Sequence, residues 1–136
     1  MSATATALVG FIMWSIVLTF TLLVVRVKAF AGGKIAFNGF QPGGGDMDAF
    51  GQRVTRAHAN SLEYLAIPVG LLGISILTGQ EEITNGLALV ALACRAAQSV
   101  IHMVSTSVPA VAVRANIFGA QIFIFIYWGL AMLGAI

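Results

Sequence analysis

Charge is scarce in this sequence of 136 residues: 9% of the residues are charged, whereas 59% are hydrophobic. Soluble domains usually carry roughly a quarter of charged residues, so a water-soluble domain is a poor description of this chain. The formal net charge of +2 is small, and no stripe of basic and aromatic residues occurs, so we expect no nucleic-acid partner. A mean hydropathy of +0.95 instead indicates an integral membrane protein.

Cysteine and histidine are also rare. Cys94 is the only cysteine, which excludes a disulfide framework and a paired-cysteine metal site. The two histidines, His58 and His102, have no metal-ligand spacing, so we expect no metal. The first apolar stretch lacks a basic start and is longer than the roughly 7–15 residues of a signal peptide. We therefore expect it to be a retained helix.

What the sequence does contain is long runs without charge. These runs cover residues 1–25, 64–80, 83–94, 96–113 and 115–136. A bilayer core of about 30 Å takes roughly 20 apolar residues per helix, and lipid requires backbone groups to pair internally. The runs predict an all-α fold, an integral membrane four-helix bundle formed by a single domain over residues 1–136. The predicted spans cover about residues 5–27, 58–79, 83–104 and 112–135.

Basic residues follow the first span, at Arg26, Lys28 and Lys34, whereas the connection near residue 80 carries Glu81 and Glu82. Because positive residues favour the cytoplasmic side, we predict a multi-pass protein with both termini on the non-cytoplasmic side. In a bacterium this membrane would be the inner, or plasma, membrane.

Local signals indicate where helices begin and bend. Asp46 or Asp48 is a suitable N-cap for the second helix. Ser107, followed by Pro109, resembles the start of the fourth helix. Pro68 is expected to bend the second span.

Four polar residues form a narrow stripe where the second helix enters the membrane: Arg53, Arg56, Asn60 and Glu63. At about 100° per residue they lie within about 80° of one another. Polar residues inside a membrane usually face the bundle interior and mark a site. Arg53 and Arg56 alone could equally extend to lipid headgroups, but this would not explain the deeper Asn60 and Glu63.

The third span adds Arg95, about 12 residues or roughly 18 Å from its outer end. Glu63 lies roughly 24 Å from the same surface, so the two side chains are candidate partners across the bundle. Gln98, Ser99 and His102 continue the face of Arg95 toward the cytoplasm.

The charges of these residues do not balance. Arg53, Arg56, Arg95 and Arg114 supply four positive charges, and only Glu63 opposes them. A purely structural ion pair of Arg95 would leave three cations unmatched, which would destabilise the bundle. We therefore expect an anionic ligand with more than one carboxylate.

The pattern of Arg53, Arg56, His58, Asn60 and Glu63, followed by Arg95, resembles the membrane-associated proteins of eicosanoid and glutathione metabolism (the MAPEG family). That family includes microsomal glutathione transferases and the prostaglandin E and leukotriene synthases. The resemblance covers essentially the whole chain. It implies a homotrimer that binds glutathione between neighbouring subunits near the cytoplasmic side.

Carried over by position, the resemblance implies seven glutathione-binding residues and one catalytic residue: Arg53, Arg56, Asn60, Glu63, Arg95, Gln98 and His102, with Arg114 as the catalytic residue. Arg114 would stabilise the thiolate, and Glu63 would accept a hydrogen bond from the glutathione amino group. Gln98 and His102 stand where the family has tyrosines. Whether Arg26 matches a first-helix arginine of the family stays open.

The function that follows is a membrane-bound, glutathione-dependent transferase or peroxidase. It would conjugate the thiolate to lipophilic electrophiles or reduce lipid hydroperoxides, and isomerase activity is also open. Its partners would be copies of itself, membrane lipids, glutathione as co-substrate and a lipophilic second substrate. The alternative is a non-catalytic lipid-binding or scaffold member of the same fold. A channel or transporter subunit would need polar residues along a full path, whereas these stop partway.

Overall fold

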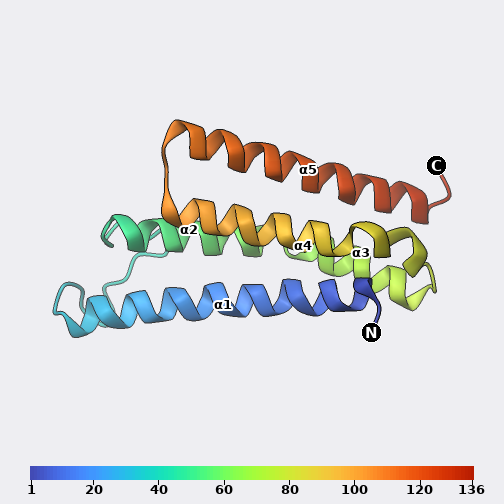
Figure 1. Cartoon of the computed structure of the whole chain (residues 1–136). Helices are drawn as coiled ribbons and strands as arrows, with labels where there is room; N and C mark the ends of the chain where they lie inside the picture. Colours follow the sequence, from blue (N-terminus) through green and yellow to red (C-terminus); the bar gives the residue numbers. More distant parts are fainter.

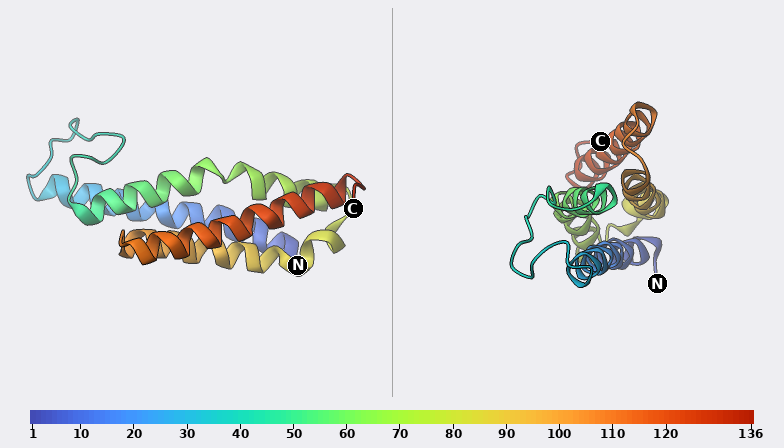
Figure 2. Two further views of the ribbon diagram at one scale, coloured as in Figure 1. Left: turned by 90° about the horizontal axis from the view of Figure 1, so that it is seen from above. Right: turned by 90° about the vertical axis from the view of Figure 1, so that its left-hand side faces the viewer.

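Four columns of helix lie side by side in the computed structural model, which describes residues 1–136 (Figure 1, Figure 2). The helices are α1 (Ala3–Ala31), α2 (Ala49–Glu63), α3 (Ala66–Leu77), α4 (Glu81–Val104) and α5 (Val108–Met132). α2 and α3 follow each other in one column. Both chain termini lie at one end of the molecule, called the terminal end here, and the long loop 32–48 lies at the other, the loop end.

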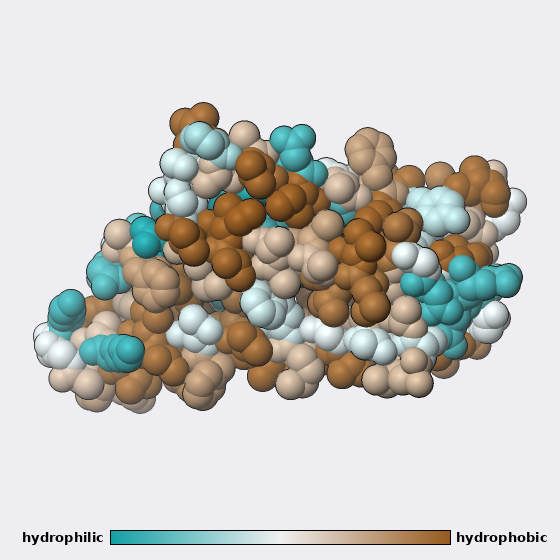
Figure 3. All heavy atoms as spheres, viewed as in Figure 1, coloured by the Kyte–Doolittle hydropathy of each residue, from teal (hydrophilic) through white to brown (hydrophobic).

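Each column is long and apolar enough to cross a bilayer: the four candidate spans are Ala3–Ala31, Ala49–Leu77, Glu81–Val104 and Val108–Met132. Hydrophobic side chains cover most of the face seen in Figure 3, and the larger hydrophilic patches on this face lie toward the two ends. The chain is therefore an all-α, multi-pass membrane protein with four long apolar helical columns, as predicted.

Polar caps set where three of these columns begin. The side chains of Ser2, Asp48 and Ser107 each accept a hydrogen bond from the backbone N–H three residues further along the chain. The bond from Gly51 N to Asp48 Oδ1 is 2.7 Å long. Such caps satisfy N–H groups that have no partner inside the helix. Asp48 and Ser107 thus act as the sequence predicted.

The second column is interrupted at Tyr64 and Leu65, between α2 and α3. Pro68 lies four residues after Tyr64 and has no N–H to donate to its carbonyl. The Tyr64 carbonyl instead accepts from Ile67 N at 3.2 Å. The predicted bend is present, and it falls directly after the polar segment.

The apolar core lies toward the terminal end. It is formed by Ala7, Phe11, Leu72, Ala88, Ala91, Phe125 and Trp128. α1 and α4 approach closely beside it, since a Cβ on Gly10 would collide with the Leu92 side chain. The buried polar residues Arg95, Gln98 and Ser99 lie further along α4, in its half toward the loop end.

α5 is the most peripheral helix and packs mainly on α4 and α3. Its buried residues are Gln121, Phe125 and Trp128, all in its second half. No residue of its first half is buried. The start of α5 is therefore free of close packing against α2, and this leaves an opening toward the loop end.

Candidate functional site

A cleft of about 180 Å³ fills this opening between α2, α4 and the first half of α5. It is lined by Asn60, Tyr64, Gln98, Val111, Arg114, Ala115 and Phe118, and is called the Arg114 cleft here. Three of the eight predicted site residues, Asn60, Gln98 and Arg114, thus come from three helices to one place.

Arg114 is the only charged side chain that lines the cleft. Its Nη1 atom is buried and has no hydrogen-bond partner within the chain. A guanidinium can only donate hydrogen bonds, and a buried donor without a partner destabilises a protein by about 1–3 kcal/mol. The cleft therefore presents a cation that requires an acceptor from elsewhere.

Arg95 is buried, with 2% of its surface exposed. Its Nη1 donates to Asn60 Oδ1 at 3.4 Å, and its guanidinium carbon lies 5.9 Å from the centre of the Tyr64 ring. Its Nη2 is buried without a partner. Arg95 does not line the cleft itself, but it contacts two residues that do, Asn60 and Tyr64.

The predicted contact between Arg95 and Glu63 is absent within the chain. Glu63 is exposed, and Arg95 contacts Asn60 and Tyr64 instead. The predicted depths of Arg95 and Glu63 in the membrane allowed a contact, but Glu63 points away from α4. Asn60 faces α4, and Glu63 lies about 60° further round the helix, on the outer surface.

The predicted stripe on α2 is therefore divided. Arg53 and Asn60 are half-buried toward α4, whereas Arg56 and Glu63 are exposed on the outside of the chain. Arg53 Nε donates to the Met103 carbonyl at 2.7 Å. The last carbonyls of a helix lack helical partners, so Arg53 closes the carboxyl end of α4.

The predicted residues of α4 also separate. Gln98 is buried, donates to Asn60 Oδ1 at 3.4 Å and accepts from Gln121 Nε2 at 2.8 Å. His102 is half-buried and does not line the cleft, although Arg56 and Arg114 are both near it.

Two residues in this region were not among the predicted site residues. Tyr64 lines the cleft, and its ring packs edge-on against Phe118 with centroids 4.8 Å apart. Its spacing of four residues from Asn60 was a signal, because such residues share a helix face. Gln121 is fully buried, and it is the only amide in the apolar run 117–136. A lone polar residue in such a run also marks a site.

A family comparison covers nearly the whole chain: the model described as the MAPEG family matches residues 4–134. The chain belongs to the MAPEG family. This confirms the resemblance inferred from the polar pattern of the second and third spans. Comparison with curated proteins gives no match, and comparison with solved structures gives none either.

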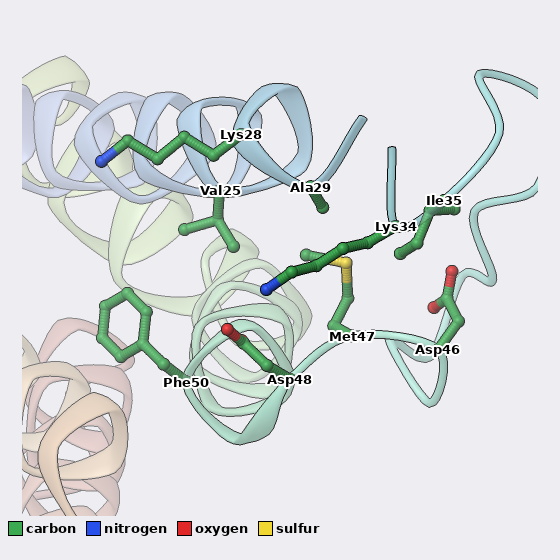
Figure 4. A pocket seen from close by; sticks show the side chains of 9 residues that line it. All are labelled: Val25, Lys28, Ala29, Lys34, Ile35, Asp46, Met47, Asp48 and Phe50. Carbon is green, nitrogen blue, oxygen red and sulfur yellow. The ribbon is translucent and has the colours of Figure 1, made fainter. Parts of the chain in front are cut away.

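A second cavity of this MAPEG-family chain, of about 210 Å³, lies at the loop end between the end of α1, the loop and the start of α2 (Figure 4). Lys34 reaches across it toward Asp48, and Met47 and Phe50 form part of its apolar wall. No predicted site residue lines it. Its mixed charges contrast with the purely cationic Arg114 cleft.

A third cavity of about 310 Å³ lies between α1 and α2 and includes Arg26, His58 and Phe40. The Arg26 guanidinium carbon lies 5.7 Å from the centre of the Phe40 ring, and its Nε is buried without a partner. His58 Nε2 shares a hydrogen bond of 3.0 Å with Thr19 Oγ1. In this MAPEG-family chain, cations thus line cavities on two sides of α2: Arg26 of α1 on one side and Arg114 of α5 on the other.

Proposed function

We propose that this protein is a glutathione-dependent membrane enzyme that stabilises the thiolate of glutathione. It would transfer the tripeptide to lipophilic electrophiles or use it to reduce lipid hydroperoxides. The observation that carries the proposal is the unpartnered, buried Nη1 of Arg114 in a cleft with Asn60, Gln98 and Tyr64. A nearby cation lowers the pKa of a thiol and so raises its nucleophilic fraction.

The distribution of charge supports an anionic tripeptide as the ligand. Arg56 is exposed on α2, the helix that carries Asn60 of the cleft, and Arg95 has a buried donor without a partner. Guanidinium groups match carboxylates well. Glu63, exposed on the same side of α2, can accept a hydrogen bond from an amino group. Arg53 contributes less, since it is engaged with the Met103 carbonyl.

The same exposure supports a homotrimer. Arg56 and Glu63 lie on the outer surface of a span that is otherwise apolar. Charged side chains that face lipid are costly, so a neighbouring copy would stabilise the protein by covering them. The ligand would then lie between two copies, near the cytoplasmic side if loop 32–48 is cytoplasmic.

Titration calorimetry in mild detergent tests the binding part of this proposal. We expect saturable heat with glutathione, and also with S-methylglutathione, which keeps the carboxylates. Only glutathione should give the near-ultraviolet absorbance of a thiolate. If neither peptide binds, the protein is better described as a lipid-binding or scaffold member of the family.

Native mass spectrometry tests the assembly. We expect three chains to be released together from mild detergent. A monomer that still binds glutathione with the same affinity would contradict a ligand site shared between copies.

A further inference from the structure

Three side-chain amides form a hydrogen-bonded chain across the bundle, from α2 through α4 to α5. Gln121 Nε2 donates to Gln98 Oε1 at 2.8 Å, and Gln98 Nε2 donates to Asn60 Oδ1 at 3.4 Å. Gln121 and Gln98 are buried, and Asn60 is half-buried at the cleft. We call Asn60, Gln98 and Gln121 the amide chain.

The groups at its two ends fix the direction of every bond in the amide chain. Arg95 can only donate, so the Asn60 atom facing it must be the oxygen. Gln98 must then present its NH₂ group to Asn60 and its oxygen to Gln121. At the other end the Ile117 carbonyl can only accept, and Gln121 Nε2 donates to it at 3.4 Å. Both ends impose the same direction.

This direction determines what Asn60 offers to a ligand. Its oxygen is occupied by Arg95 and Gln98, whereas its Nδ2 has no hydrogen-bond partner within the chain. Asn60 lines the Arg114 cleft, so this NH₂ group is a donor available there. With Arg114 Nη1 as the other free donor, the cleft favours a ligand that presents acceptor oxygens or a thiolate.

Gln121 acts at a distance in this arrangement. It is fully buried and does not line the cleft, so its effect on a ligand must pass through Gln98. Without Gln121, the Gln98 oxygen would be buried with no donor, and the Gln98 amide would be free to turn away from Asn60. Asn60 would then be held by Arg95 alone.

We infer that Gln121 is a positioning residue, which orients the Asn60 amide through Gln98 so that Nδ2 donates to an acceptor group of the bound anionic peptide. This inference rests on the proposed function, because it concerns the ligand of the same cleft. It adds a residue outside the cleft to those that determine the affinity of the site.

A double-mutant cycle on the full-length protein in mild detergent tests this role. The variants are Gln121→Met, Asn60→Ala and their combination, with glutathione affinity measured by calorimetry. Methionine has a similar size and no amide. Ser75→Ala is the matched control, since Ser75 is also fully buried and hydrogen-bonded but belongs to a network at the terminal end.

We expect Gln121→Met to weaken glutathione binding about three- to tenfold, the effect of one lost hydrogen bond. In the Asn60→Ala background the same substitution should change affinity less than twofold. The thiolate absorbance at saturating glutathione should stay, because Arg114 is untouched. Ser75→Ala should lower the unfolding temperature and leave affinity unchanged.

Two results would overturn the inference: unchanged affinity in Gln121→Met, or an equal loss of affinity in both backgrounds. The second result would show that Gln121 supports the fold and not the orientation of Asn60. Absence of glutathione binding to the unaltered protein is a different outcome, because it rejects the proposed function before any variant is compared.

Discussion

Both ends of the bundle contain buried polar residues, but the two ends differ in how completely these residues are hydrogen-bonded to one another. At the terminal end, Thr84 Oγ1 shares hydrogen bonds with Thr4 Oγ1 at 2.7 Å and with Ser75 Oγ at 2.8 Å. Asn85 Oδ1 accepts from both the backbone and the side chain of Thr4. These hydroxyl groups satisfy one another and join α1, α3 and α4. Glu81 Oε2 and Trp128 Nε1 lack partners there, but neither residue lines a cavity.

At the loop end the buried polar groups satisfy one another only in part, through the amide chain and Arg95. Five atoms there are buried without partners, and three of them belong to cations: Arg26 Nε, Arg95 Nη2, Arg114 Nη1, Asp46 Oδ1 and Gln121 Oε1. A closed network stabilises a fold, whereas an open one with excess donors destabilises it until a ligand completes it. Buried polar groups therefore join the helices at the terminal end, whereas several of them remain without a partner at the loop end.

Removing the cation of the cleft is expected to have the largest effect. Arg114→Ala should reduce turnover with a lipophilic electrophile, such as an activated halonitrobenzene, by about 10²–10³-fold. Much of the glutathione affinity should remain, and the thiolate absorbance should disappear. Lys34→Ala is the control, since Lys34 lines a different cavity at the same end. Full turnover with an intact thiolate signal would assign thiolate stabilisation to another residue.

Glu63→Gln should have the next largest effect. A charge-assisted hydrogen bond contributes about 1.5–3 kcal/mol, so glutathione affinity measured by calorimetry should fall about tenfold or more. Thermal stability should not change, because Glu63 is exposed and does not contact Arg95 within the chain. Glu82→Gln, at an exposed glutamate of the terminal end, should change neither quantity. A stability loss with unchanged affinity would favour a structural role between copies.

Thr84→Val should produce the opposite result at the terminal end. It leaves the hydroxyls of Thr4 and Ser75 without their shared partner, so the free energy of unfolding should fall by about 1–3 kcal/mol. Glutathione affinity should not change. The control is Thr78→Val, since the exposed Thr78 hydroxyl bonds only to the Ile74 carbonyl of its own helix. A loss of affinity in Thr84→Val would show that the two ends are coupled.

Trp14→Phe should have the smallest effect and would mark the limit of the binding region. Trp14 Nε1 donates to Ser99 Oγ at 3.2 Å, but Ser99 keeps its own bond to the Arg95 carbonyl. We expect a loss of about 1 kcal/mol or less in unfolding free energy and no change in affinity. A clear fall in glutathione affinity would extend the ligand region to α1.

Much of the architecture could be predicted because it depends on local signals. Charge-free runs gave the four spans, Asp48 and Ser107 marked helix starts, and Pro68 marked the interruption of the second column. Each of these depends on residues that are neighbours in the sequence. Every column begins before its predicted span, and the second begins nine residues earlier, because the polar segment 49–57 is helical although it is not apolar.

The arrangement within the site was less predictable, because it depends on how each helix is turned. A stripe about 80° wide can include both a buried and an exposed face, which is why Asn60 meets Arg95 and Glu63 does not. The partner of Arg53 is the backbone carbonyl of Met103, and no side-chain pattern reveals it. Gln121 was visible as a lone amide, but its partner depends on how α5 packs against α4.

The interruption at Tyr64 divides the second column into two segments, α2 and α3, that pack against different parts of the bundle. α2 packs on α1 and α4, whereas α3 also packs on α5 and contributes to the apolar core. The regular hydrogen-bond ladder is interrupted between them, so the direction of α2 is not fixed by a continuous helix through α3. Tyr64 lies at this interruption, and its ring packs against Phe118 of α5 and lies 5.9 Å from the Arg95 guanidinium carbon of α4, so the point where the column is interrupted also forms part of the wall of the Arg114 cleft.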